Sequence, residues 1–271
     1  MNKAIFKKIH NNLLTTRAVS VLGPRLYADY LSGFLTHLPE IVRSRDLRVL
    51  DKLMGQSAEK FHYRGTNVVF DCRFCDEHIK DGTFAFGIAR EIYIRDCYFK
   101  YHLPSTFTDA RTVLDLGANR GAFSVLTARQ AEFVLCVEAT EAYVPVIQHN
   151  LQINGCRRYA VERVFVGAGG EMGDDLLPTI TVEDLLLRHN NQDIDFVKMD
   201  IEGSEFALFE SADWLKGVKA LTMEVHSSFG DPNQILETLK RHNFLCIFAN
   251  DNLDRVSDPA EANFIYAWKD V

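Results

Sequence analysis

Seven consecutive residues, Asp115-Leu116-Gly117-Ala118-Asn119-Arg120-Gly121, join an apolar stretch to a predicted helix at residues 123–129. Gly117 and Gly121 have no β-carbon, so a turn here can be tight and its backbone can approach a ligand closely. The helix that follows presents free N–H groups at its start. Because ligands of open parallel sheets bind beyond the carboxyl ends of the strands, we predict that this turn holds part of a ligand.

An acidic residue, Glu138, ends the next predicted strand and lies seventeen residues after Gly121. A carboxylate at this position can accept hydrogen bonds from both ribose hydroxyls of an adenosine. A glycine turn followed by an acid is typical of NAD sites as well as S-adenosylmethionine sites, and alone it separates neither. The turn has Asn119 where a pyrophosphate needs a glycine, and no large substrate domain follows it. Both features favour S-adenosylmethionine.

Titratable side chains gather at the ends of two later predicted strands. They are Asp200, Glu202 and Glu205 after residues 196–199, and Glu224 and His226 at residues 221–225. Transfer of a methyl group to an alcohol requires that the acceptor be aligned and its proton removed. His226 is the predicted base, because its ordinary pKa of about 6.5 lets it accept a proton at neutral pH. The alternative is a histidine that only orients or caps.

The four catalytic candidates are Asp200, Glu202, Glu224 and His226, and together they could also hold a divalent metal. Oxygen-rich sets suit hard cations, and a bound metal could acidify a hydroxyl directly. No tight ligand motif stands out, so the prediction is that there is no metal site. Glu205 falls in the first turn of a predicted helix, where an acid is often present only for the helix dipole.

From residue 112 onward, apolar strands alternate with helices. The strands are predicted at residues 113–114, 133–137, 161–166, 196–199, 221–225, 244–249 and 263–268. The helices are predicted at residues 123–129, 181–188, 205–215 and 233–242, with a further helix that ends near Asn154. Such alternation specifies a mostly parallel sheet with helices on both faces, so residues 111–271 are predicted to form a Rossmann-like α/β domain.

Two regions precede this domain. Residues 58–110 contain short β-like runs and are predicted to form a small β-rich cap. These runs are residues 68–70, 84–86 and 91–94. Residues 1–57 have apolar side chains at helical spacing, which predicts a helical N-terminal segment with breaks at Gly23-Pro24 and Pro39. This segment could cover the acceptor site or form a homodimer contact.

The composition describes an ordinary globular chain of 271 residues with 47% hydrophobic and 25% charged residues. The formal net charge of -7 provides no basic field that would attract nucleic acid. Cys72 and Cys75 form a CxxC without a second ligand pair, so no zinc site is predicted. There is no secretory signal, and no apolar run approaches the ~18 residues of a membrane span. A cytoplasmic protein is therefore predicted.

Five stretches resemble the FkbM family of methyltransferases between about residues 111 and 250. They are TVLDLGANRGAFS, VEATEAYVPVIQHNLQIN, TVEDLL, FVKMDIEGSEFALFESA and LTMEVH. DLGAN followed downstream by DIEGSE and EVH is more specific than a glycine motif alone. One departure concerns the acid-proline pair usual in the family, which here is Glu138-Ala139 with a proline displaced to Pro145.

The resemblance implies a class I methyltransferase fold with a mostly parallel seven-stranded sheet, and S-adenosylmethionine as cofactor. By position, Asp115, Gly117, Asn119 and Gly121 would shape the methionine and ribose pocket, and residues 166–169 would lie near the adenine. The full predicted cofactor set is Asp115, Gly117, Ala118, Asn119, Gly121, Glu138, Ala139, Val166 and Asp200.

For many members of the family the resemblance implies O-methylation of a sugar or natural-product hydroxyl. The expected partner is therefore a small-molecule acceptor, with a sugar favoured over a polyketide hydroxyl, a carboxylate or an amine. Two alternatives stay open at this point. One is an NAD-dependent oxidoreductase that uses the same turn and Glu138. The other is a catalytically silent binding or scaffold protein.

Overall fold

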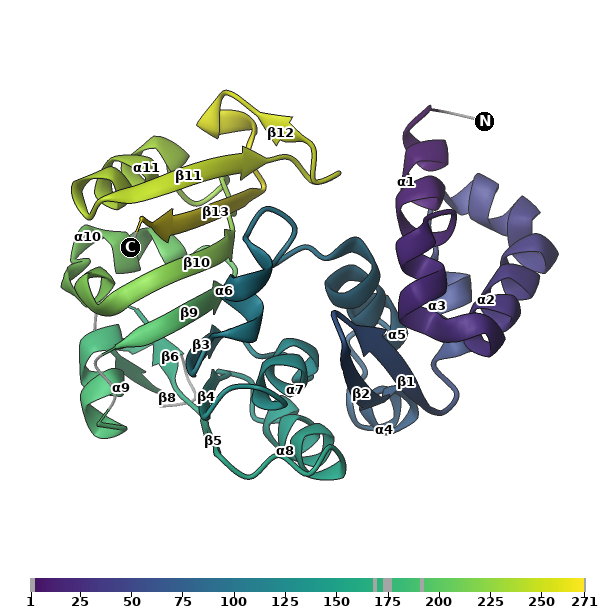
Figure 1. Cartoon of the computed structure of the whole chain (residues 1–271), viewed down its shortest axis with the longest axis horizontal. Helices are drawn as coiled ribbons and strands as arrows, with labels where there is room; N and C mark the ends of the chain where they lie inside the picture. The colour runs from purple at the N-terminus through teal and green to yellow at the C-terminus, as the bar shows by residue number, and fades with distance from the viewer. Residues whose placement is uncertain (1–2, 168–169, 173–176, 191–192, 271) are drawn as a thin grey trace.

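The computed structural model of the chain describes residues 3–167, 170–172, 177–190 and 193–270. Its centre is an eight-stranded sheet in the order β12-β11-β13-β10-β9-β3-β4-β5 (Figure 1). These strands are β3 (Thr112–Leu116), β4 (Phe133–Val137), β5 (Tyr159–Glu162), β9 (Ile194–Met199), β10 (Val218–Glu224), β11 (Phe244–Ala249), β12 (Arg255–Val256) and β13 (Phe264–Lys269). A smaller sheet contains β6 (Phe165–Val166), β8 (Leu177–Ile180) and β7 (Gly170–Met172) in that order.

The large sheet is parallel from β5 through β4, β3 and β9 to β10, whereas β13 pairs antiparallel with both β10 and β11. The seven predicted strands are present, and the two-residue β12 extends one edge. The predicted Rossmann-like class I methyltransferase fold is therefore confirmed. The parallel strands all end at one edge of the sheet. The residues that follow β3, β4, β9 and β10 are Gly117, Glu138, Asp200 and Val225.

Both faces of the sheet are buried. The central strands contribute to two apolar cores, because their successive side chains point to opposite sides of the sheet. In β3, Val113 belongs to one apolar core, and its neighbours Leu114 and Leu116 belong to a second core on the other face. The helices that cover the sheet are α7 (Ala122–Ala128), α8 (Tyr143–Ile153), α9 (Val182–Arg188), α10 (Glu205–Glu210) and α11 (Pro232–Arg241). Figure 1 shows α7 and α8 on one side and α9, α10 and α11 on the other. Short 3-10 turns, η2 (Asp213–Gly217) and η3 (Pro259–Glu261), complete this domain.

Residues 3–110 pack against the side of the sheet that carries α7 and α8 (Figure 1). Their elements are α1 (Lys3–Leu13), α2 (Thr16–Ser44), α3 (Arg48–Met54), β1 (Ala58–Tyr63), β2 (Thr66–Asp71), α4 (Cys72–His78), α5 (Ala85–Ala89), the π-helix η1 (Arg90–Arg95) and α6 (Pro104–Thr108). One continuous apolar core runs from Ile9 to Tyr266 and joins this region to the sheet. Asn154 also bridges the two parts, since its side-chain oxygen accepts a hydrogen bond from the backbone N–H of Val69 at 2.8 Å.

The strand predicted at residues 68–70 is confirmed as part of β2. Those predicted at residues 84–86 and 91–94 are wrong, because residues 85–86 lie in α5 and residues 91–94 lie in η1. Short apolar runs do not distinguish a strand from a buried helix. The buried apolar residues here are Ala85, Phe86, Ala89, Ile92, Tyr93 and Ile94. Neighbours such as residues 92–94 are buried together, as is typical of a helix that the core encloses on several sides. The region predicted as a β-rich cap therefore contains a single hairpin, β1–β2, and is otherwise helical over its regular elements.

Three predicted boundaries also differ from the structure. Pro39 does not end a helix, because α2 continues through it to Ser44; Pro39 is exposed, so the carbonyl that its ring leaves unpaired can be hydrated. Gly23 is non-helical with a φ of 70°, as predicted for a break at Gly23-Pro24. The strand predicted at residues 161–166 is divided between β5 and β6, and the helix predicted at residues 205–215 is divided between α10 and η2.

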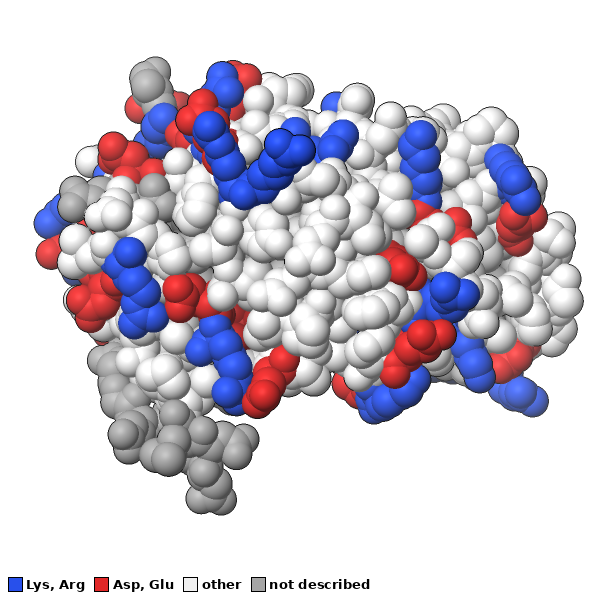
Figure 2. Space-filling view, turned by 90° about the horizontal axis from the view of Figure 1, so that it is seen from below, with Lys and Arg blue, Asp and Glu red and all other residues white. Residues whose placement is uncertain are grey.

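Charged side chains of both signs are interspersed on the face shown in Figure 2, with no continuous basic surface. Among the described residues, none of the helices has the length and apolar character that crossing a membrane requires.

Candidate active site

The glycine turn after β3 has a left-handed backbone at three positions. The φ angles are 78° at Gly117, 50° at Asn119 and 79° at Gly121. The backbone N–H groups of Gly117 and Ala118 both donate to the carbonyl of Val137, at 3.0 and 2.9 Å, which ties the turn to the end of β4. A β-carbon at Gly117 would lie 1.8 Å from the carbonyl oxygen of Asp200. The turn therefore needs glycine there, because the loop after β9 passes directly against it.

Glu138 lies at the end of β4 and is 8% exposed. One carboxylate oxygen accepts a hydrogen bond from the backbone N–H of Asn119, and the other accepts one from the backbone N–H of Thr140, both at 2.8 Å. These bonds fix the carboxylate between the glycine turn and the loop after β4. A carboxylate has about four acceptor positions, so two remain for a ligand.

A cavity of about 370 Å³ opens above these strand ends. Six of the nine predicted cofactor residues line it: Gly117, Asn119, Glu138, Ala139, Val166 and Asp200. Val137, Val164 and Phe165 contribute apolar parts of its wall. The predicted residues thus converge on one space although they come from four separate segments of the chain.

The other three predicted cofactor residues are not part of that lining. Ala118 lines the neighbouring cavity, and a β-carbon at Gly121 would face Ile147 of α8, 3.2 Å from its Cα. Asp115 is fully buried and forms an ion pair with Lys198 at 3.3 Å. Ala168 and Gly169, expected near the adenine, lie outside the described residues.

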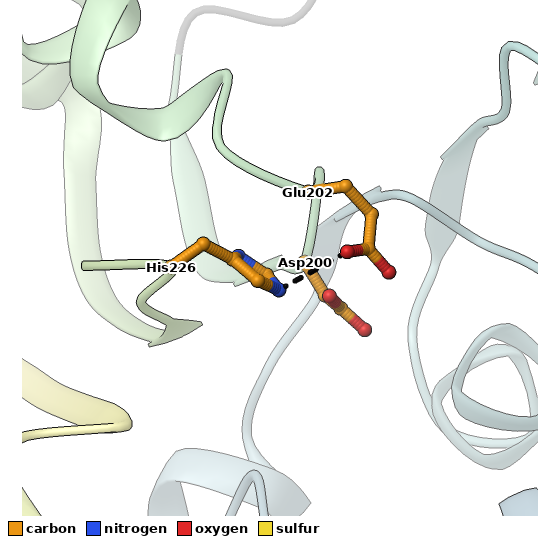
Figure 3. A group of neighbouring side chains, drawn as sticks. All are labelled: Asp200, Glu202 and His226. Carbon is orange, nitrogen blue, oxygen red and sulfur yellow. Dashed lines mark ion pairs between the residues drawn. The ribbon is translucent and has the colours of Figure 1, made fainter. Parts of the chain in front are cut away.

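Asp200, Glu202 and His226 lie together at the ends of β9 and β10, and Figure 3 shows their polar atoms facing one another. One carboxylate oxygen from each acid and one ring nitrogen of His226 all lie within 4.8 Å of one another. The carboxylate of Glu202 lies 3.3 Å from Nε2 of His226 (Figure 3). Three of the four predicted catalytic residues are therefore in direct proximity.

Glu205 holds His226 in place. It is fully buried, and one of its oxygens accepts hydrogen bonds from the backbone N–H of His226 at 2.7 Å and from Nδ1 at 3.0 Å. Its other oxygen accepts from the backbone N–H of Gly203 at 2.8 Å. The hydrogen bond to Glu205 raises the pKa of His226 to about 9, although partial burial opposes this. Glu205 thus does more than complement a helix dipole, and the imidazole does not have the ordinary pKa expected from the sequence.

A second cavity of about 420 Å³ adjoins the first. The two share Asn119, Tyr143, Asp200 and Glu202. Glu224, the fourth predicted catalytic residue, lines this second cavity. Its pKa is raised to about 8, mainly by burial and secondly by the nearby charge of Asp200. The opposite wall comes from the region before the sheet, with Asp81, Thr83, Ile88, Glu91, Ile92, Arg95 and Tyr98.

Sequence reasoning missed three residues that position the site. Lys198 is buried in β9, lies 3.4 Å from the carbonyl oxygen of Leu116 and also donates to the carbonyl of Gly117. Its lone charge in the apolar run FVKM is a signal that could have revealed it. Tyr98 donates to the carboxylate of Asp200 at 3.2 Å. No local pattern marks Tyr98, because its partner is 102 residues away in the chain.

Asp81 connects the region before the sheet to the glycine turn. Its carboxylate accepts from Nη2 of Arg120 at 3.0 Å and from the hydroxyl of Tyr143 at 2.6 Å. The Arg120 side chain is fully buried, and its Nη1 donates to the side chain of Asn119 at 3.1 Å. The Tyr143, Arg120 and Thr83 hydrogen bonds outweigh the effect of burial and hold the pKa of Asp81 well below its ordinary value.

Residues 166–246 match a family model, the methyltransferase FkbM domain. The matched stretch contains Asp200, Glu202, Glu205, Glu224 and His226, so it covers the whole cluster at the ends of β9 and β10. The resemblance seen in the sequence is thereby confirmed over these residues. No curated protein matches the chain.

Several solved structures are similar at low identity. A precorrin-6y C5,15-methyltransferase from Geobacter metallireducens GS-15 is 15% identical over 61% of this chain and 85% of that chain, with a TM-score of 0.39. An rRNA methylase from Streptococcus thermophilus is 11% identical over 62% and 90%, with a TM-score of 0.42. An O-methyltransferase from Bacillus cereus in complex with SAH is 17% identical over 61% and 77%, with a TM-score of 0.39. The fold is shown by the strand order of the large sheet, and the family match covers residues 166–246.

Proposed function

We propose that the protein transfers a methyl group from S-adenosylmethionine to a hydroxyl of a sugar or small natural product. The observation that supports this best is the convergence of the glycine turn and the Glu138 carboxylate on one cavity beyond the strand ends. An open α/β sheet binds its ligands at this edge. Part of the cavity lining, including Val166 and Asp200, lies within the FkbM match.

The residues of this cavity suit the donor. Glu138 retains acceptor positions for the two ribose hydroxyls, and its hydrogen bonds to Asn119 and Thr140 hold it rigid. The bare backbone at Gly117 permits close approach, and Val166 supplies an apolar surface for the adenine. Asp200, which lines both cavities, can accept a hydrogen bond from the donor's amino group. S-adenosylmethionine supplies an already activated methyl group, so the chain must chiefly orient the acceptor and remove its proton.

The second cavity is proposed as the acceptor site, because it meets the donor cavity at Asn119, Asp200 and Glu202. Its lining contains the carboxylates of Glu91 and Asp251 beside aromatic rings. Carboxylates accept hydrogen bonds from hydroxyl groups and repel anions, which favours a sugar or other polyol over a carboxylate acceptor.

The proton of the acceptor would be lost near the four catalytic candidates His226, Asp200, Glu202 and Glu224. The remaining expectations also stay proposals: a small-molecule acceptor, no nucleic-acid substrate, a cytoplasmic location, and a homodimer through residues 1–57.

The test is a calorimetric titration of the full chain with S-adenosylmethionine, S-adenosylhomocysteine and NAD. Glu138→Ala should lower the affinity for both adenosyl ligands at least tenfold, since each charge-assisted hydrogen bond that is lost contributes about 1.5 to 3 kcal/mol. Glu141→Ala is the matched control, because this nearby acid is exposed and is not among the residues that line the cavity. Binding of NAD alone would overturn the methyltransferase proposal in favour of an oxidoreductase. If none of the three ligands binds, the result favours a catalytically silent scaffold.

A further inference from the structure

We propose that Asp200, Glu202 and His226 form a binding site for one divalent cation, with Glu205 as the residue that positions His226. The binding itself is independent of the proposed methyl transfer. What the cation would do there rests on the proposed function.

The spacing of the three donor atoms fits a single ion. Two ligands at about 2.1 to 2.3 Å from a cation are separated by about 3 Å when they are adjacent and by about 4.5 Å when they are opposite. The donor atoms of Asp200, Glu202 and His226 all lie within 4.8 Å of one another, and the Glu202–His226 pair is 3.3 Å apart. The three atoms are therefore close enough to share one ion once their side chains adjust to it.

The orientation of His226 is the independent observation that points to a ligand. Metal-binding histidines characteristically donate their second ring N–H to a carboxylate or carbonyl, which fixes the ring and its tautomer. Glu205 is outside the donor set, is fully buried, and accepts from Nδ1 of His226 at 3.0 Å. Nε2 is thereby left to face Asp200 and Glu202, as Figure 3 shows.

The position of the site leaves room for a ligand of the cation. Asp200 and Glu202 line both cavities, and the Glu202 side chain is 85% exposed, so the ion would face open space. Two carboxylates and one imidazole form a mixed oxygen and nitrogen set with open positions, which suits Mn²⁺ or Zn²⁺.

A cation at this point would lower the pKa of an acceptor hydroxyl in the second cavity. The hydroxyl proton would pass to solvent, the oxygen would form the new O–CH₃ bond, and the S–CH₃ bond would break to leave S-adenosylhomocysteine. A ring nitrogen that holds a cation cannot also accept this proton. His226 would therefore be a ligand of the cation and not the base that the sequence predicts.

The experiment uses the purified full chain after treatment with EDTA and dialysis. MnCl₂ is titrated while electron paramagnetic resonance measures free Mn²⁺. We expect one bound ion, an affinity at least tenfold lower in Glu202→Gln, and loss of binding in Asp200→Asn. Glu205→Gln should weaken binding about 10- to 100-fold, as is usual when the partner of a metal-bound histidine is removed. Glu210→Gln is the control, an exposed carboxylate on α10 that is not part of the cluster, and should bind like the wild type.

Two results would overturn the cation site. One is no Mn²⁺ bound at about 1 mM, a concentration that as a dissociation constant corresponds to only about 4 kcal/mol. The other is equal Mn²⁺ binding by the wild type and Glu202→Gln. Because Glu202 is at the surface, Glu202→Gln keeps the test valid if Asp200→Asn fails to fold. A parallel titration with S-adenosylhomocysteine in EDTA separates the two proposals. If S-adenosylhomocysteine binds and Mn²⁺ does not, only the cation site is refuted. If Mn²⁺ binds and S-adenosylhomocysteine does not, only the methyltransferase proposal is refuted.

Discussion

Replacement of Gly117 by alanine tests whether the close approach of two loops builds the donor site. An alanine at a φ of 78° has a left-handed backbone, which costs about 1 to 2 kcal/mol. The new β-carbon would also lie 1.8 Å from the carbonyl oxygen of Asp200, whereas real contacts stay above 3.0 Å, so one loop must move by about 1.2 Å. Such a movement would strain the hydrogen bond from the Asp200 N–H to the Leu116 carbonyl, which is 3.0 Å long.

Gly155→Ala separates strain from collision. Gly155 has a similar φ of 69°, but nothing lies within 4 Å of a β-carbon built there. We therefore expect Gly155→Ala to lose only about 1 to 2 kcal/mol of unfolding free energy and to bind the donor normally. Gly117→Ala should lose about 3 kcal/mol or more, since displaced backbone adds to the same strain. Its affinity for S-adenosylhomocysteine should fall at least 100-fold, which corresponds to about 2.7 kcal/mol.

Urea unfolding measures the first quantity, and calorimetric titration of the folded variants measures the second. If Gly117→Ala and Gly155→Ala lose equal stability, the collision is relieved without cost and the geometric argument fails. If Gly117→Ala is destabilised but binds S-adenosylhomocysteine with wild-type affinity, the turn is structural and the donor lies elsewhere.

Two further predictions concern buried charge. Lys198→Met should lower the unfolding free energy by about 3 kcal/mol in urea, because the fully buried Asp115 would lose its cation. The exposed Lys219→Met is the control, and equal losses would contradict the reasoning. Burial lowers the pKa of His102 to about 4. The unfolded chain therefore binds the additional proton between about pH 6.5 and pH 4, and stability should fall by up to about 3 kcal/mol as the pH drops through that window. His102→Gln should flatten this part of the stability profile, and an unchanged slope would refute the assignment.

The part of the site formed by the glycine turn and Glu138 could be predicted from the sequence, because each of its features is local. A strand, a glycine turn and an acid at the end of the next strand determine where Gly117 and Glu138 lie once the strands are parallel. The partner of His226 was harder to predict. Glu205 falls in the first turn of a helix, where the dipole alone is a sufficient explanation for an acid, and only the fold shows its carboxylate against the imidazole.

The region before the sheet was predicted least well, for a physical reason. Its apolar residues are buried against other parts of the same core, so short runs such as Phe84-Ala85-Phe86 show no amphipathic period that separates strand from helix. The contacts of Tyr98 with Asp200 and of Asp81 with Arg120 are long-range. A pattern in one segment cannot contain them.

The two parts of the chain contribute different walls of the proposed site. The strand ends of the sheet provide Glu138, Asp200 and His226, whereas the facing wall of the second cavity is built by residues 81–98. Asp81 connects residues 81–98 to the sheet domain, because its carboxylate accepts hydrogen bonds from both Arg120 and Tyr143. If methyl transfer is confirmed, selectivity for the acceptor should therefore follow substitutions in α5 and η1, and donor affinity should follow the strand ends. An acceptor preference that is unchanged by substitutions at Ile88 or Glu91 would place the acceptor outside this cavity.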